Sequence, residues 1–332
     1  MTEITNEHGI DILALAWLLV DDYDHDSGKD IAPKGKLLSA SQLLKSTKAI
    51  VLSKRVDYST EVMDISERSS SCIGQSLHNA VEGVWTSGQY KESLKLANIP
   101  QDIIDSIVVN PDPNGIPEGK VPAYFEQRGF KEICGYTIKG KFDAVFDGNL
   151  RDLKTTSTYN WTSGNNDENY KLQGSIYKWI FPEIITGDKI KIVFMFNDWT
   201  KGRAENNPDY PPSKVSHKYY NLLTEEETQS WLENKVTKID EHMDMHQDDM
   251  IRCTDKELWR NPPIYKYYSK PESALKPNAR ATKNFDSLAE AEKYKQEKGR
   301  GVVVTKYGEV KACTYCNAFS ICNQRKEYFS DE

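Results

Sequence analysis

Two carboxylates and a lysine lie close together around a short turn, in the stretch GKFDAVFDGNLRDLKTT. Asp152 and Lys154 are two residues apart in an expected strand, so their side chains share one face of it. The Asp-Gly-Asn turn at 147–149 reverses the chain and can bring Asp143 opposite Asp152. Carboxylates that converge in this way repel each other unless a cation lies between them.

A divalent cation at this turn would suit the hydrolysis of a phosphate ester. Mg²⁺ binds one or two carboxylates together with water and phosphate oxygens. A lysine beside such an ion can orient the attacking water or stabilise charge on the phosphate. The turn therefore predicts a metal site that acts on phosphates. The alternative is a surface hairpin that carries charged residues and binds nothing.

Two flanking segments carry polar residues in a suggestive order. The segment GQSLH ends at His78, and Gln173 and Tyr177 are four residues apart, so they share one face of an expected helix. Together with GKFD and RDLKTT, these motifs resemble the RecB-like branch of the PD-(D/E)XK nuclease superfamily. That branch has a helix ending in G-x-x-x-H, strands bearing G-x-x-D and D/E-x-K, and a helix bearing Q-x₃-Y. The resemblance covers residues 37–200.

The resemblance implies a role for each matching residue. The ligands of Mg²⁺ or Mn²⁺ would be His78, Asp143, Asp152 and the carbonyl of Leu153. Lys154 would position or activate the water, and Gln173 and Tyr177 would brace the strands or contact DNA. Glu126, in YFEQRGF, lies on a strand just before the hairpin, and either contacts the site or is a plain surface residue.

The same resemblance implies a fold and an activity. The fold would be α/β, a restriction-endonuclease-like core in which helices flank a central mixed β-sheet. The activity would be that of a metal-dependent DNA exonuclease, encoded by a phage or mobile element and used in DNA processing, recombination or defence. Its partner would be single-stranded or double-stranded DNA ends. The alternative is a non-catalytic nucleic-acid-binding scaffold that retains the nuclease fold.

Three cysteines near the end of the chain form a C-x₂-C-x₅-C pattern, namely Cys313, Cys316 and Cys322. A C-x₂-C loop holds one metal ion or cluster from two sides. A fourth ligand is expected, and Cys253 is our choice because it begins the segment that the other three would close. Cys72 is the alternative, whereas Cys134 lies in an expected strand and is assigned to the core.

The cysteine pattern resembles that of iron–sulfur exonucleases of the AddB and CRISPR-adaptation types. In those proteins C-x₂-C-x₅-C and a cysteine before the first nuclease motif hold a 4Fe–4S cluster. The corresponding segment here, LLSASQLLKSTKAIVL, contains no cysteine, so Cys253 would replace that ligand. A 4Fe–4S cluster is expected, with Zn²⁺ as the alternative because four thiolates suit both. Its role would be to hold the tail to the core.

These residues need an α/β framework to position them. The expected divisions are an N-terminal segment at 1–36, a nuclease core at 37–247 and a cysteine-bearing C-terminal extension at 248–332. Helices are expected at 10–20, 37–55, 165–181, 224–247 and 285–299, and residues 71–99 are expected to contain one helix followed by further helix. Strands are expected within 120–156, at 189–199 and 214–223, with a hairpin at 301–310. The near-continuous apolar run KIKIVFMF predicts a central strand.

Composition restricts the class of protein. The 332 residues carry a formal net charge of −7, so there is no overall attraction for nucleic acid, although a local basic groove can still bind phosphates. The apolar run from Ile10 to Val20 is too short to span a bilayer and lacks the basic start of a secretory signal. A cytoplasmic protein with no membrane partner is expected.

Three further features leave alternatives open. His242 and His246 have a spacing compatible with zinc, but a solvated helix face is preferred. The aromatic and lysine-rich stretch at 259–270 and the basic loop at 276–284 either bind DNA or pack as ordinary loops. The sequence has no G-x₄-G-K-[ST] motif, so a helicase or recombination partner would be a separate chain.

Overall fold

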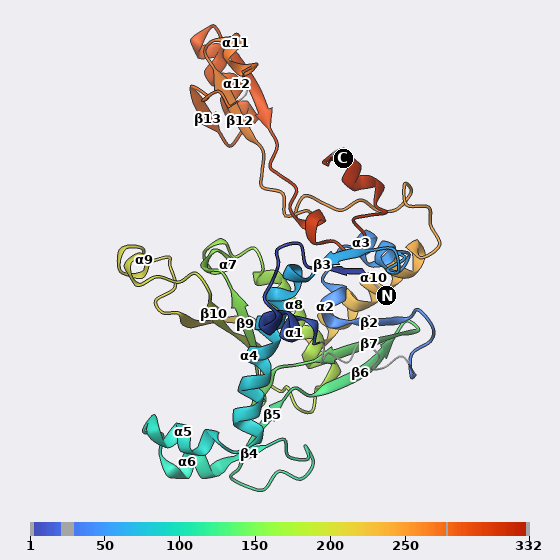
Figure 1. Cartoon of the computed structure of the whole chain (residues 1–332), viewed down its shortest axis with the longest axis vertical. Helices are drawn as coiled ribbons and strands as arrows, with labels where there is room; N and C mark the ends of the chain where they lie inside the picture. The colour runs from blue at the N-terminus through green and yellow to red at the C-terminus, as the bar shows by residue number, and fades with distance from the viewer. Residues whose placement is uncertain (1–2, 21–29, 277, 330–332) are drawn as a thin grey trace. The chain divides into compact units, whose positions relative to one another are not determined.

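The computed structural model describes residues 3–20, 30–276 and 278–329 (Figure 1). Residues 21–29 of the expected N-terminal segment lie outside the described residues. The chain divides into two compact units, of which the first contains residues 1–44 and 57–240 and the second contains residues 45–56 and 241–332. Within the described ranges, no helix is both long enough and apolar enough to cross a membrane.

A six-stranded mixed sheet forms the centre of the first unit (Figure 1). The strand order is β11-β10-β9-β8-β5-β4; β9 and β10 are parallel, as are β4 and β5, and the other neighbouring pairs are antiparallel. The strands are β4 (Ile107–Val109), β5 (Val121–Phe125), β8 (Ala144–Phe146), β9 (Asn149–Thr156), β10 (Lys189–Phe196) and β11 (Val215–Asn221). The prediction of a mixed α/β architecture is confirmed.

Strand β10 lies inside this sheet, between β9 and β11, as its apolar run predicts. Its buried side chains alternate along the strand: Ile190, Ile192, Phe194 and Phe196. Helix α8 (Asp167–Ile180) packs against β10. Gly174 makes this approach possible, because a Cβ there would lie only 3.0 Å from the Ile190 side chain.

Two smaller sheets complete the strands of the first unit. One has the order β2-β7-β6, and the other pairs β1 with β3. Their strands are β1 (Glu3–Thr5), β2 (Leu37–Ser39), β3 (Val62–Asp64), β6 (Arg128–Ile133) and β7 (Tyr136–Lys141). The remaining helices are α1 (Ile12–Leu19), α2 (Ala40–Leu43), α4 (Ser69–Thr86), α5 (Tyr90–Leu96), α6 (Gln101–Ser106), α7 (Thr158–Ser163), α9 (Lys201–Asn206) and α10 (Glu225–His242). The last two residues of α10 belong to the second unit. A short 3₁₀ turn spans Ile65–Arg68.

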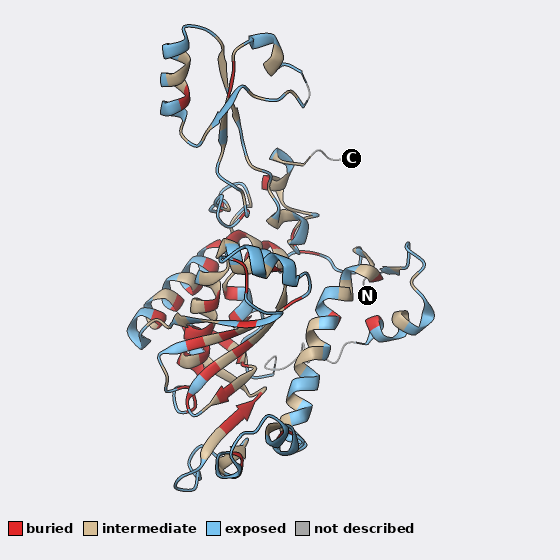
Figure 2. Cartoon of the chain, turned by 90° about the vertical axis from the view of Figure 1, so that its left-hand side faces the viewer, coloured by how far each residue is buried: buried red, intermediate tan, exposed pale blue. Residues whose placement is uncertain are grey.

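Aromatic packing fixes α4 on the main sheet. The Trp85 ring stacks on Phe125 of β5 with centroids 5.2 Å apart and meets the edge of Phe146 of β8 at 4.9 Å. Such pairs stabilise a contact beyond the area that they bury. Elsewhere α4 buries only Cys72 fully, and Figure 2 shows the sheet as the main site of burial. Because Trp85 contacts both β5 and β8, it fixes the C-terminal end of α4 on the sheet and thereby positions the earlier turns of the helix.

Three expected elements differ from the structure. The single helix expected at 37–55 is a strand followed by two helices, because Ser39 forms a capping box that starts α2 and Ser46 caps a separate α3 (Thr47–Ser53). The helix expected at 224–247 begins at its capping box, as predicted, but ends at His242. The segment expected as a hairpin at 301–310 is one strand, which pairs with a distant partner.

The second unit contains α3, an irregular segment that carries Cys253, a three-stranded sheet and the cysteine-bearing tail. The sheet has the antiparallel order β13-β12-β14, and its strands are β12 (Ile264–Tyr268), β13 (Lys283–Phe285) and β14 (Val302–Lys306). Helices α11 (Pro271–Ala274) and α12 (Leu288–Lys298) lie between the strands in sequence. The tail has two 3₁₀ turns, Ala312–Tyr315 and Asn323–Glu327.

Candidate active site

The β8–β9 hairpin brings the two aspartates together. Its register pairs Ala144 with Arg151, so Asp143 is placed opposite Asp152 as the sequence predicts. Both central turn residues are left-handed, with φ of 47° at Asp147 and 73° at Gly148, which suits the twist of a two-residue hairpin. The Leu153 amide donates a 2.7 Å hydrogen bond to Oδ2 of Asp143 and fixes that carboxylate.

A histidine and two acids converge beside this hairpin. His78 Nδ1, on α4, lies 3.4 Å from Oδ1 of Asp143 and 3.5 Å from Oε1 of Glu126. In the part of the chain that the structure describes, this is the one group of three His, Cys, Asp or Glu ligand atoms within 4.8 Å of one another. Burial alone would lower the pKa of His78, but hydrogen bonds and charge from Asp143 and Glu126 raise it to about 10. The imidazole is therefore held as a cation between the two acids when no metal is bound.

Asp152 is buried with an unsatisfied oxygen. Its side chain is 1% exposed, Lys154 Nζ lies 2.8 Å from Oδ2, and Oδ1 has no hydrogen-bond partner among the described residues. Burial raises the pKa of Asp152 to about 6, against the opposing attraction of Lys154. Burying a carboxylate oxygen without a hydrogen-bond donor costs folding free energy, so the position of Asp152 fits a residue that binds a cation.

Lys154 stays charged despite its surroundings. Burial would lower its pKa, but the carboxylates of Asp152 and Asp143 raise it above the ordinary lysine value. Its ammonium group is therefore a hydrogen-bond donor and a fixed positive charge at neutral pH. A lysine in this state can orient water or phosphate oxygens but does not accept a proton.

Gln173 and Tyr177 lie on the face of α8 that adjoins the site. Gln173 Nε2 donates a 2.8 Å hydrogen bond to the Tyr177 hydroxyl. Tyr177 is buried against Gly140 of β7, where a Cβ would lie 3.1 Å from its ring. Burial raises the pKa of Tyr177, and the charges of Asp152 and Asp143 add to the shift. The pair thus fixes β7, the strand that leads into Asp143, against the helix.

Glu126 is the site residue that sequence reasoning left undecided. The structure buries its side chain, with 9% exposed, and pairs Oε2 with Lys141 Nζ in addition to the His78 contact. Its φ of 52° is unusual for a residue other than glycine. This bend between β5 and β6 turns Glu126 toward His78. No pattern of charge or of side-chain alternation in the sequence predicts the bend.

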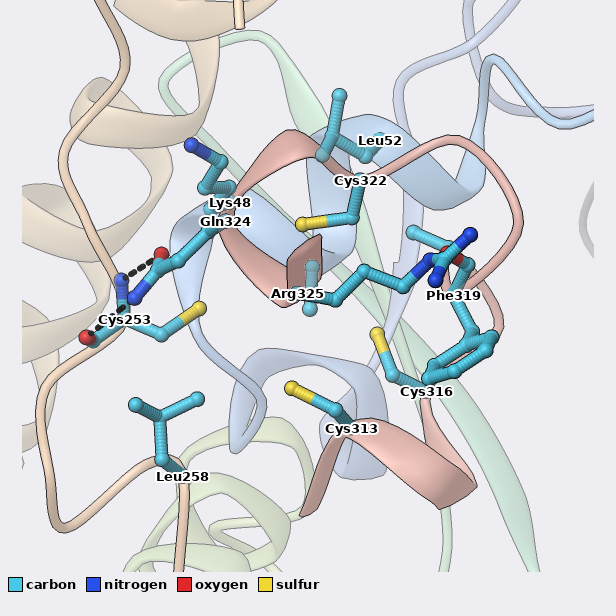
Figure 3. A pocket seen from close by; sticks show the side chains of 12 residues that line it. Lys48, Leu52, Cys253, Leu258, Cys313, Cys316, Phe319, Cys322, Gln324 and Arg325 are labelled. Atoms are coloured by element: carbon cyan, nitrogen blue, oxygen red, sulfur yellow. Dashed lines mark hydrogen bonds between the residues drawn. The ribbon is translucent and has the colours of Figure 1, made fainter. Parts of the chain in front are cut away.

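The four cysteines of the expected metal centre point into one cavity of the second unit (Figure 3). The cavity has a volume of about 30 Å³, and Cys253, Cys313, Cys316 and Cys322 line it. No three of these described sulfur atoms lie within 4.8 Å of one another. Burial raises the pKa of Cys313 to about 11 and raises those of Cys253 and Cys316 as well. Thiols packed in this way need a cation before they ionise together.

The other two cysteines have different surroundings. Cys72 is buried in an apolar cluster of the first unit with Leu18 and Ile65. The expectation that Cys134 lies in the core is wrong: Cys134 is exposed and occupies the turn between β6 and β7, with φ of 47°. The alternation of EICGYTI does not reveal that Cys134 and Gly135 form the reversal itself.

The expected histidine pair does not form a shared face. Helix α10 ends at His242, which is buried and accepts a hydrogen bond from the Ile251 amide through Nε2. His246 lies beyond the helix, is exposed, and has its Nδ1 3.5 Å from Asp248. The preference for a solvated helix face is therefore wrong for His242, and the two histidines do not share a face of α10.

A groove opens at the carboxyl ends of β9 and β10, four residues after Lys154. It has a volume of about 900 Å³ and is lined by residues of both signs and by aromatic rings, among them Thr158, Tyr159, Trp161, Arg203, Tyr210 and Lys218. Tyr159 is 59% exposed, and Lys218 Nζ lies 4.4 Å from the centroid of the Trp161 ring. Tyr159 is the exposed ring among these, since Tyr210 is buried and Lys218 Nζ donates a 2.7 Å hydrogen bond to the Trp161 carbonyl.

Comparison with known proteins gives limited similarity. No protein-family model and no curated protein matches the chain. The chain is 17% identical in sequence to the protein whose structure is described as the crystal structure of SSO0001. That match covers 62% of this chain and 77% of the other chain, with a TM-score of 0.38. The chain is 10% identical to a protein from Eubacterium rectale named "putative exonuclease", covering 71% of this chain and 95% of that one with a TM-score of 0.36. The assignment of the site therefore rests on its own geometry.

Proposed function

We propose that this chain is a metal-dependent deoxyribonuclease of the RecB-like type, which removes nucleotides from DNA ends. The observation that carries the proposal is the buried Asp152 carboxylate. It has an unpartnered oxygen and lies across a hairpin from Asp143, which joins His78 and Glu126. Carboxylates and an imidazole arranged in this way match the donors that Mg²⁺ and Mn²⁺ take in proteins.

The residues that would hold the ion are His78, Glu126, Asp143, Asp152 and the carbonyl of Leu153. When bound, Mg²⁺ or Mn²⁺ supplies Lewis-acid polarisation of the phosphate and a more acidic water. Lys154 would hold the attacking water or a phosphate oxygen by donating hydrogen bonds. Its raised pKa excludes it as a general base at neutral pH. Gln173 and Tyr177 would keep the strands in register behind the site.

The cysteine cavity would hold a 4Fe–4S cluster, with Zn²⁺ as the alternative. A single Zn²⁺ binds four sulfurs at about 2.3 Å each, which places neighbouring sulfurs roughly 4 Å apart. A 4Fe–4S cluster also takes four thiolates, so the donor set suits both groups, and analysis of bound iron, sulfide and zinc distinguishes them. Lining residues from α3 and from the tail suggest that its role is to join these segments. A separate helicase or recombination protein would supply unwound DNA.

The test is digestion of end-labelled linear DNA with Mg²⁺ or Mn²⁺ by protein purified without oxygen. We expect Asp152→Asn, Lys154→Ala and Glu126→Gln each to lower the cleavage rate by about 100-fold or more. Glu132→Gln, an exposed residue of β6, is the matched charge control and should retain activity. Circular DNA should resist the enzyme if ends are required. A folded, metal-loaded wild type that leaves all DNA intact would establish the non-catalytic scaffold instead.

A further inference from the structure

Residues 264–306 of the second unit form a basic module within an acidic protein. This module contains ten lysine and arginine residues and five acidic residues, a formal net charge of +5. Because the whole chain carries −7, the remainder carries −12. Such a separation of charge is typical of a chain in which one part binds a polyanion.

Helix α12 covers one face of the module's sheet. The Tyr294 ring meets Tyr267 of β12 at 5.1 Å and Phe285 of β13 at 5.2 Å, and Ala291 of α12 is fully buried. Lys283 lies on this same side, with Nζ 4.7 Å from the centroid of the Tyr294 ring. These contacts define the helix side of the sheet.

The opposite face is open over much of its area. Side chains alternate along strands, so residues that neighbour Tyr267 in sequence point away from α12. Strand register places together on this face Ile264, Lys266, Asn284, Val304 and Lys306. Ile264 is 41% exposed and Val304 is 37% exposed, which leaves aliphatic surface between the two lysines.

A basic loop borders this open face. Tyr268, which points to the open side, donates a 3.3 Å hydrogen bond to the carbonyl of Ala279 and ties the loop after α11 to the sheet. The loop contributes Lys276 and Arg280, both exposed. We use the name basic face for the open face of the sheet together with this loop.

The helix side of the module carries charges of both signs, because α12 bears Lys293, Lys295 and Lys298 beside its acids. Glu290, Glu292 and Glu297 lie on α12, and Asp286 lies just before it. In the described part of the chain, Lys295 is the one basic residue of the module that is paired with an acidic side chain, Glu292 at 2.9 Å. The lysines of the basic face are therefore available to an external anion.

We propose that the basic face binds the sugar–phosphate backbone of DNA. The identification of DNA as the polyanion rests on the proposed nuclease function. Lys266, Lys306 and Arg280 would contact phosphates, and Ile264 and Val304 would pack against deoxyribose. Contacts of this kind position a strand without reading its sequence.

The experiment measures binding separately from cleavage. Full-length Asp152→Asn protein is titrated in EDTA with a fluorescein-labelled oligo(dT) strand over a series of salt concentrations. The double variant Lys266→Gln/Lys306→Gln removes two charges from the basic face. The double variant Lys293→Gln/Lys298→Gln removes two charges from the helix side of the same module and is the matched control.

We expect the basic-face variant to bind several-fold more weakly and to reduce the slope of log K against log salt by about 0.7 for each lysine. The helix-side variant should keep the parent slope. Equal slopes for both variants, or displacement of the strand by poly-glutamate as efficiently as by unlabelled DNA, would overturn the proposal. Lys276→Gln/Arg280→Gln gives the same test without touching a strand, should the first variant fold poorly.

Failure of this proposal differs from failure of the nuclease proposal. If the wild type cuts DNA but the basic-face variant keeps the parent salt slope, the nuclease proposal stands and the basic-face proposal fails. If the wild type never cuts DNA, but its binding depends on Lys266 and Lys306 and not on Lys293 and Lys298, the basic-face proposal stands and the nuclease proposal fails.

Discussion

The Leu153 amide donates a hydrogen bond of 2.7 Å to Oδ2 of Asp143. Leu153 separates Asp152 from Lys154, so this one bond joins the two strands that bear the acids. It also leaves Oδ1 of Asp143 facing His78 at 3.4 Å. The geometry of the candidate site therefore depends on hairpin register before it depends on any metal.

Asp152 lowers the stability of the metal-free protein at neutral pH. Its pKa is about 6 in the folded chain and 3.8 ordinarily. Between about pH 4 and 6 the native state binds a proton that the unfolded state has released, so the unfolding free energy falls as pH rises through this window. We predict that Asp152→Asn stabilises the protein in EDTA at neutral pH by about 3 kcal/mol while cleavage is lost.

Thermal unfolding of the two proteins at several pH values provides the measurement. The stabilisation should vanish below about pH 4, where Asp152 is protonated in both states. Glu132→Gln should show no such gain at neutral pH. An Asp152→Asn protein that melts below wild type at neutral pH in EDTA would contradict the prediction.

His78 makes metal binding depend on pH. Its folded pKa of about 10 means that the cationic form stabilises the metal-free protein fully below its ordinary value of 6.5, and that this contribution is lost as pH rises through 10. A metal ion needs the neutral imidazole, so binding at neutral pH releases a proton. We predict that Mn²⁺ affinity rises about tenfold per pH unit between about pH 7 and 9.

Calorimetric Mn²⁺ titrations in buffers of different ionisation enthalpy count the released proton. His78→Asn should bind Mn²⁺ more weakly and with little pH dependence over the same range. A wild-type affinity that is flat with pH would show that His78 does not bind the metal.

Sequence reasoning succeeds where local spacing determines the outcome. The hairpin turn and the alternation of side chains place Asp143 opposite Asp152 and put Lys154 on the same face as Asp152. The capping box at Thr224 starts α10 where predicted. Each of these depends on residues that are near neighbours along the chain or across one tight turn.

Sequence reasoning fails or leaves alternatives open where a backbone reversal decides the outcome. Cys134 is exposed because it occupies a turn with φ of 47°, and the φ of 52° at Glu126 accompanies the contact with His78 that the sequence left undecided. Both positions hold residues that rarely adopt this conformation, so composition does not signal it. No local pattern predicts the strand at 37–39, since its partner β7 lies about a hundred residues away in sequence.

The Gly148 turn sets the hairpin register, and its substitution should disturb the site. An added Cβ would lie 2.0 Å from Thr186 Oγ1, on a backbone that already has φ of 73°. Gly135 has the same φ in the β6–β7 turn, with nothing within 4 Å of an added Cβ. We predict that Gly148→Ala destabilises the protein by about 2 kcal/mol more than Gly135→Ala.

Denaturant unfolding compares the two glycine variants directly. Gly135→Ala isolates the conformational cost of a side chain at positive φ, roughly 1 kcal/mol. Gly148→Ala should also lower DNA cleavage, whereas Gly135→Ala should leave the rate close to wild type. Equal losses of stability would show that Thr186 moves away without cost.

Cys253 is predicted to be a ligand of the tail centre, and Cys72 is not. Cys253 shares a cavity with Cys313, Cys316 and Cys322, whereas Cys72 packs against Leu18 and Ile65 in an apolar cluster. Cys253→Ser should therefore lose most bound iron or zinc and unfold at lower temperature, because metal binding contributes folding free energy directly. Iron, sulfide and zinc assays with visible absorption on oxygen-free protein distinguish the cluster from the ion. Cys72→Ser and the exposed Cys134→Ser are controls that keep full metal content, and a metal-replete Cys253→Ser protein would remove Cys253 from the ligand set.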